Sequence, residues 1–118
     1  MSDYGISITW GAAKTGREAA SLALWADAMG HAEKLKANGR IDDYDAILFG
    51  ATAGGAPNGV FTLWGSEDQI KELVFDEERA QLVQRTGLLL NDVAEVRSIR
   101  GNAILEGLGS FTELVNGL

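Results

Sequence analysis

The sequence NGVFTLW at residues 58–64 decides the fold. Asn-Gly is the strongest short signal for a β-hairpin turn, because both residues accept positive φ angles. The residues after it are mostly apolar, and so is the run from Ala46 to Phe49 before it. We therefore predict two antiparallel strands, over residues 41–51 and 60–65. The glycine-rich loop between them, residues 50–59, is interpreted as a hairpin tip or a cavity lid.

The segment before this hairpin predicts a strand followed by a helix. Residues 4–10 alternate between large apolar and small side chains, which is typical of a strand with one buried face. Thr15 and Glu18 have the spacing of a capping box, in which the two side chains bond each other's backbone N–H groups. They predict a helix that runs to about Ala37.

The segment after the hairpin repeats the helix–strand pattern. A second capping box, Ser66 with Gln69, predicts a short helix to about Leu73, and Asp76 is a good N-cap for a further helix. Residues 92–100 predict a fourth strand. A third capping box, Ser110 with Glu113, predicts a short helix at the C-terminus.

The predicted order is therefore β-α-β-β-α-β followed by a short helical appendage. This order is typical of an α+β, ferredoxin-like sandwich, in which two helices cover one face of a four-stranded antiparallel sheet. A chain of 118 residues suits one compact domain. We expect residues 1–118 to form a single ferredoxin-like domain.

Composition excludes several classes of function. The chain has no cysteine, which excludes disulfides, thiolate nucleophiles and zinc fingers, and it has only one histidine. The net charge is −7 and the ten basic residues are scattered, so we expect no nucleic-acid or membrane partner. No phosphate-binding motif is present, and we expect no cofactor and no metal. Without a secretion signal or a bilayer-length apolar stretch, a cytoplasmic location is expected.

Acidic residues gather at the start of the second predicted strand. Asp42, Asp43 and Asp45 lack the spacing of a calcium-binding loop. We interpret them as charges that discourage edge-to-edge pairing of sheets.

The apolar central hairpin has a consequence for assembly. Two helices cover only one face of a four-stranded sheet, and an open face in water should carry polar residues at alternate positions. Because the hairpin is apolar on both faces, we predict that the open faces of two sheets pack together in a two-fold homodimer. The alternative is that the C-terminal segment folds over this face within one chain.

Several short motifs occur in an order that resembles a known group of proteins. The motifs are Gly16-Arg17-Glu18, Gly39-Arg40-Ile41, Asn58-Gly59, Trp64-Gly65-Ser66 and Glu77-Glu78-Arg79-Ala80-Gln81-Leu82-Val83. Over residues 4–101 the chain resembles an uncharacterised group of small bacterial ferredoxin-like proteins, which is similar to the dimeric α/β-barrel superfamily. The resemblance implies a homodimer with a cavity between sheet and helices in each subunit. That superfamily includes cofactor-independent monooxygenases, haem-degrading enzymes, lactone isomerases and proteins without known activity, and none of their catalytic residues matches a position here.

A few side chains are candidates for chemistry. His31 is the only conventional base near neutral pH and is the candidate catalytic residue; alternatively it is a boundary residue with one hydrogen bond. The candidate ligand-binding residues are Ser7, Thr9, Trp10, Trp64 and Arg97. The tryptophans end strands, where cavity mouths form, and Arg97 would meet an anionic group. Their alternative roles are ordinary core packing and solvation.

Two functions remain open. The first is a homodimeric small-molecule-binding protein, or a cofactor-independent enzyme, for a small organic compound such as an aromatic one. The second is a non-catalytic structural or protein-interaction module. A cavity whose protein gains several degrees of thermal stability from an aromatic compound favours the first, and a dry, filled sheet interface with no pocket favours the second.

Overall fold

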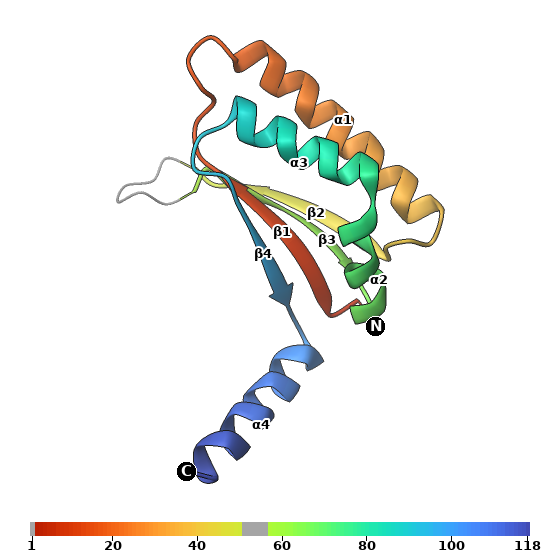
Figure 1. The fold of residues 1–118 in the computed structure, drawn as a ribbon, viewed down its shortest axis with the longest axis vertical. Helices are drawn as coiled ribbons and strands as arrows, with labels where there is room; N and C mark the ends of the chain where they lie inside the picture. The colour runs from red at the N-terminus through yellow and green to blue at the C-terminus, as the bar shows by residue number, and fades with distance from the viewer. Residues whose placement is uncertain (1, 51–56) are drawn as a thin grey trace.

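The computed structural model describes residues 2–50 and 57–118, so residues 51–56 of the predicted loop lie outside the described residues. Figure 1 shows the arrangement of the elements. In chain order they are β1 (Tyr4–Trp10), α1 (Glu18–Ala37), β2 (Asp43–Leu48), β3 (Gly59–Gly65), α2 (Glu67–Glu72), the 3₁₀ turn η1 (Leu73–Phe75), α3 (Glu77–Leu89), β4 (Ala94–Ile99) and α4 (Asn102–Asn116).

The four strands form one sheet in the order β2-β3-β1-β4, and every neighbouring pair is antiparallel. Helices α1 and α3 lie side by side over one face of this sheet (Figure 1). The predicted α+β, ferredoxin-like architecture is therefore confirmed, including the antiparallel pairing of β2 with β3.

Alternation along the strands places the core between sheet and helices. Ile6 of β1 and Leu63 of β3 pair in register and face the helices. They pack against Ala32 and Leu35 of α1, Ile41 before β2, Ile70 of α2 and Leu73 of η1, all of which are buried. The large apolar side chains at alternate positions of residues 4–10 therefore face the helices, as the pattern predicts.

Of the first two predicted capping boxes, the one at Ser66 forms and the one at Thr15 does not. Ser66 and Gln69 form the predicted box, with Ser66 Oγ accepting from the Gln69 N–H and Gln69 Oε1 accepting from the Ser66 N–H. The Thr15 box is wrong: α1 begins after Arg17 without a side-chain cap. Gly16 has a φ of 81°, and this left-handed turn separates Thr15 from the first helical turn.

The prediction of a short C-terminal helix beginning at Ser110 is also wrong. A single helix, α4, runs without a break from Asn102 to Asn116. Its apolar residues continue at helical spacing straight through Ser110, from Ile104 to Val115. A continuous apolar stripe outweighs a local capping signal, because the signal only chooses between alternative helix starts.

The C-terminal segment does not fold over the open face of its own sheet. Helix α4 leaves the end of β4 and points away from the body of the molecule (Figure 1). Among the described residues it has only marginal contact with other elements. The alternative to a dimer, a tail laid across its own sheet, is therefore wrong.

The open face is less apolar than the sequence pattern predicts. One cross-strand row is largely apolar and runs Ile47–Val60–Thr9–Ala94. The next row is mostly polar and includes Asp45, Thr62 and Ser7, with only Val96 apolar. The open face is therefore mixed in character.

Trp64 lies on this open face but is covered within its own chain. A Cβ on Gly5 would lie 2.7 Å from Cε3 of Trp64, so the indole lies directly over the glycine. The guanidinium carbon of Arg100, which follows β4, lies 4.0 Å from the centroid of the indole ring. The indole Nε1 donates a hydrogen bond to Asp45 Oδ2 at 3.2 Å. Trp64 is 8% exposed for these reasons.

Candidate functional site

An apolar cavity of about 340 Å³ lies between the sheet and helices α1 and α3. Its floor is made by side chains of β1 and β3, including Ile8 and Phe61, and its roof by α1 and α3, including Leu24 and Leu82. Exposed Leu22 and Leu48 also line it. A volume in this range suits a small organic molecule.

Aromatic rings form one wall of the cavity. Trp10 meets Trp25 edge-on, with ring centroids 5.7 Å apart, and Trp25 meets Phe61 in the same way at 6.0 Å. Tyr44 stacks on Phe61 at 5.9 Å. Edge-to-face packing fixes the rings of Trp10, Trp25 and Phe61, which present apolar surface to the cavity.

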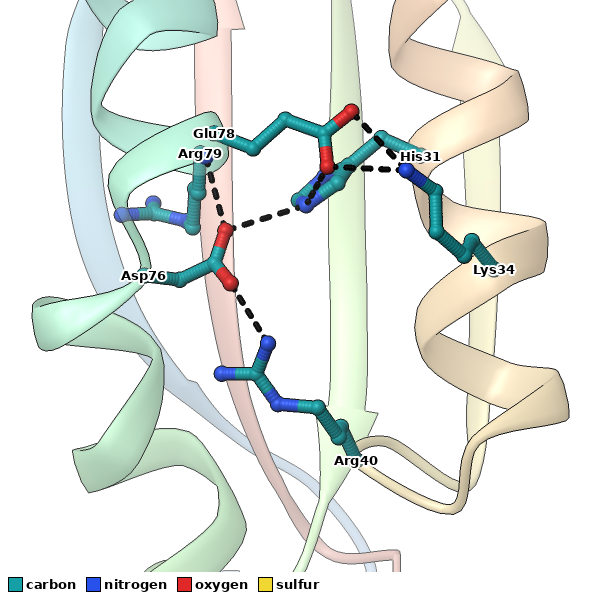
Figure 2. A network of polar contacts seen from close by, with 6 residues as sticks. All are labelled: His31, Lys34, Arg40, Asp76, Glu78 and Arg79. Carbon is teal, nitrogen blue, oxygen red and sulfur yellow. Dashed lines mark hydrogen bonds and ion pairs between the residues drawn. The ribbon is translucent and has the colours of Figure 1, made fainter.

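His31 is the titratable side chain of α1 that lines the cavity. It is 5% exposed, and its Nε2 lies 3.0 Å from Asp76 Oδ2 (Figure 2). The partner carboxylate caps α3, since Asp76 Oδ2 also accepts from the Arg79 N–H at 2.8 Å. A single carboxylate therefore connects the start of α3 with the middle of α1.

Asp76 is held by cations and N–H groups around it. Arg40 Nη1 lies 2.5 Å from its Oδ1 (Figure 2). Burial by itself raises the pKa of Asp76, but the Arg79 N–H, the Arg40 guanidinium and the His31 ring outweigh burial, so that this pKa lies below its usual range. An ionised carboxylate only accepts hydrogen bonds, so Nε2 of His31 carries the proton. In neutral His31 the lone pair then sits on Nδ1.

Two further side chains flank this pair. Glu78 Oε2 lies 3.8 Å from His31 Nε2 and 3.1 Å from Lys34 Nζ (Figure 2). Because Glu78 and Lys34 are each about half exposed, their contacts are weakly stabilising. The His31–Asp76 pair is the buried centre of the network.

Arg79 is a cavity residue that the sequence analysis missed. Its side chain lines the cavity, is nearly buried and forms an ion pair with Glu95 of β4. It lies in the charged run Glu77-Glu78-Arg79, which is typical of a solvated helix start. The signal that would have found it is spacing, because Arg79 shares a helix face with Leu82 and Val83.

The structure separates the residues that the sequence analysis grouped as candidates. His31 and Trp10 line the cavity. Ser7, Thr9 and Trp64 lie on the opposite face of the sheet, where the Ser7 hydroxyl is hydrogen-bonded to those of Thr62 and Ser98 at 2.6 Å each. Arg97 is exposed on β4 and does not line the cavity. Alternation explains the split, because Ser7 and Thr9 point away from Trp10 along one strand.

Within residues 2–50 and 57–118, no group of three or more histidine, aspartate or glutamate side chains is placed to hold a metal ion. In the same part of the chain no helix combines the length and the apolar character that crossing a membrane requires.

Comparison with known proteins finds likeness in structure and none in sequence. No protein-family model matches the chain. No curated protein matches it either.

Three solved structures are similar over most of the chain. One is a dimeric protein of unknown function and ferredoxin-like fold from Bacteroides fragilis, with a TM-score of 0.55 and 14% identity, covering 82% of this chain and 96% of that one. The second is At3g17210 from Arabidopsis thaliana, with a TM-score of 0.61 and 9% identity over 84% of this chain and 95% of that one. The third is NE2512, a protein of unknown function from Nitrosomonas europaea, with a TM-score of 0.55 and 22% identity over 86% and 93%. At these identities the likeness shows the fold alone.

Proposed function

We propose that this chain is a homodimeric small-molecule-binding protein, with a cavity in each subunit for a small, neutral, aromatic compound. The observation that carries the proposal is the cavity of about 340 Å³ between sheet and helices. Like most ligand pockets, it combines apolar and aromatic walls with a few polar groups. Those groups are His31, Arg79, Ser21 and Thr86.

The charges around the cavity favour a neutral compound over an anion. Arg79 is paired with Glu95, and His31 is paired with ionised Asp76. An added carboxylate would lie close to Glu95 and Asp76, and like charges at short range repel. An aromatic ring, in contrast, fits against Trp10 and Trp25 without breaking any pair.

The homodimer is supported by one structural neighbour and by exposed apolar surface. The similar protein from Bacteroides fragilis is described as dimeric. In this chain Ile47 and Val96 are about half exposed on the open sheet face. Because about half of each side chain is already covered, burying the remainder between two copies is favourable by roughly 1 kcal/mol for each one.

Tryptophan fluorescence tests the cavity. We expect 1-naphthol to quench the emission of wild-type protein and of Trp64→Phe, because Trp64 lies on the far face of the sheet. The quench should disappear in the Trp10→Phe/Trp25→Phe protein, which retains only Trp64. Saturating probe should raise Tm by several degrees, since binding at 100 times Kd stabilises by about 2.7 kcal/mol. A quench that survives loss of Trp10 and Trp25 would place the probe outside the cavity and reject the proposal.

If the cavity is catalytic, His31 is its base. Asp76 orients the ring, and proton transfer to a positioned imidazole accelerates reactions by roughly 10²–10⁴-fold. For any compound that the wild-type protein converts, we expect His31→Gln to lower kcat at least 100-fold while 1-naphthol quenching is retained. Turnover that is unchanged in His31→Gln would discard the catalytic role and leave a binding protein.

One observation favours the second function, a non-catalytic interaction module. The C-terminal helix exposes large apolar side chains, including Leu108 and Phe111. Such a surface is typical of protein contact. A protein that assembles but shows neither probe quenching nor a Tm shift would support this module over the small-molecule function.

A further inference from the structure

Helix α4 is strongly amphipathic, and within residues 2–50 and 57–118 no other element packs against its apolar side. Its central apolar stripe has helical spacing and comprises Ile104, Leu108, Phe111 and Val115. Leu105 and Leu114 flank the stripe and Leu118 follows the end of the helix, and all seven side chains are 41–101% exposed. The opposite side of the helix carries Glu106, Ser110 and Glu113.

The helix is not expected to be stable without cover. It has 15 residues, which is the marginal length for an isolated helix in water. Gly107 and Gly109 weaken it further, and no side chain caps its N-terminus. The apolar arc must therefore be packed against something for the helix to persist.

The backbone at Gly101 directs α4 away from its own sheet. Gly101 has a φ of 58°, and a Cβ there would lie 2.9 Å from Asp3 Oδ1. The residue before it is clamped to the N-terminal segment, because the Arg100 N–H donates to Asp3 O and Arg100 Nε donates to Ser2 O. The cover must consequently come from another molecule.

We infer that α4 of each copy packs across the open sheet face of a second copy, so that the two helices are exchanged between the subunits. This inference rests on the homodimer of the proposed function, and it places the partner's helix, rather than the partner's sheet, against the open face. The receiving surface is the row Ile47–Val60–Thr9–Ala94 together with neighbouring Val96.

The dimensions of helix and sheet agree. Ile104 and Val115 are eleven residues apart, which is about 16 Å along a helix. The two edge strands β2 and β4 are separated by three inter-strand spacings, or about 14 Å. One α4 therefore spans the sheet from one edge to the other.

The area also matches a stable dimer. A large apolar side chain removes on the order of 100 Å² from water when buried. Seven such side chains, on average about two-thirds exposed, offer on the order of 400 Å² per helix. Two exchanged helices and the two surfaces they cover would bury on the order of 1,600 Å², the size of a standard specific interface.

Charge argues against a lipid surface as the occupant. Helix α4 contains no lysine or arginine and carries two glutamates on its polar side. Helices that lie on anionic membranes have the opposite character, with basic polar faces. A second copy of this chain offers α4 the uncharged row Ile47–Val60–Thr9–Ala94, beside a row that is mostly polar.

Full-length variants test the exchange by sedimentation at micromolar concentration. We expect wild-type protein at twice the chain mass of 12.6 kDa. Leu108→Glu/Phe111→Glu should raise the dimer dissociation constant at least 100-fold. Asn102→Glu/Ser110→Glu adds the same two charges to the polar side and should leave the dimer intact. A monomeric wild type, or a dimer unaffected by the first pair, overturns the inference.

Disulfide trapping tests where the helix lies, because the chain has no cysteine of its own. Separate Val96→Cys and Leu108→Cys proteins, mixed and oxidised, should form mixed disulfides in preference to either self-linked species. Dominant self-linking of Leu108→Cys would instead show paired α4 helices and contradict the exchange.

Quenching by 1-naphthol in the Leu108→Glu/Phe111→Glu protein should persist, because the cavity is on the other sheet face. That readout separates failure of the exchange from failure of the cavity.

Discussion

Replacement of Asp76 by alanine is expected to lower the free energy of unfolding by about 2–3 kcal/mol. Loss of a helix N-cap costs about 1 kcal/mol, and Asp76 caps α3. The remainder comes from His31 and Arg40, which lose their carboxylate partner. Removing one member of a buried pair costs about 3–5 kcal/mol, but Arg40 is 42% exposed and can turn to water, so the expected loss is smaller. Urea unfolding at pH 7 measures it.

Asp76→Asn is the matched control, because asparagine caps a helix as well as aspartate and carries no charge. Asp76→Asn should lose only the part of the folding free energy that depends on the negative charge of Asp76. Since the pKa of Asp76 is lowered by folding, that part is fully present above the unfolded value of about 4 and is lost as pH falls through the folded value. The stability gap between wild type and Asp76→Asn should therefore close in acid. A gap that is constant from pH 7 to pH 3 would contradict an ionised Asp76 in the folded protein.

Ile70→Ala is expected to destabilise the fold by about 2–5 kcal/mol, the range for truncating a fully buried aliphatic side chain. Ile70 is 1% exposed and belongs to the core between sheet and helices. Leu88→Ala, at a position that is 69% exposed, should change stability by less than about 0.5 kcal/mol. Chemical denaturation at one fixed protein concentration compares the two. Similar effects at both positions would mean that α2 is not packed into the core.

The fold was predictable because local signals and the overall pattern agree. The alternation along β1 corresponds to an observed strand, and the caps at Ser66 and Asp76 correspond to observed helix starts. Asn58-Gly59 indicated the hairpin correctly but does not form its turn, because Gly59 is already paired with Leu48 as the first residue of β3 and neither Asn58 nor Gly59 has a positive φ. Local signals failed where a second interaction competed with them. The left-handed Gly16 removed the Thr15 cap, and the apolar stripe of α4 ran through Ser110.

The candidate site was less predictable, because it is made of contacts between distant segments. His31 and Trp10 could be chosen from residue type and position alone. The pairing of His31 with Asp76 joins residues 45 apart in the chain, and no periodicity encodes it. Trp64 was grouped with Trp10 because both end strands, and Ser7 was chosen as a small polar side chain of the first strand. The side of the sheet on which the cavity lies depends on where the helices pack.

The position of Asp76 has a consequence for local opening of the chain. Its two oxygens bond the first turn of α3, the middle of α1 and the loop that leads to β2. The first turn of α3 therefore cannot fray without breaking contacts in two other segments. In native-state hydrogen exchange, the amide of Arg79 should behave as part of the same cooperative unit as the central amides of α1, rather than as a helix end.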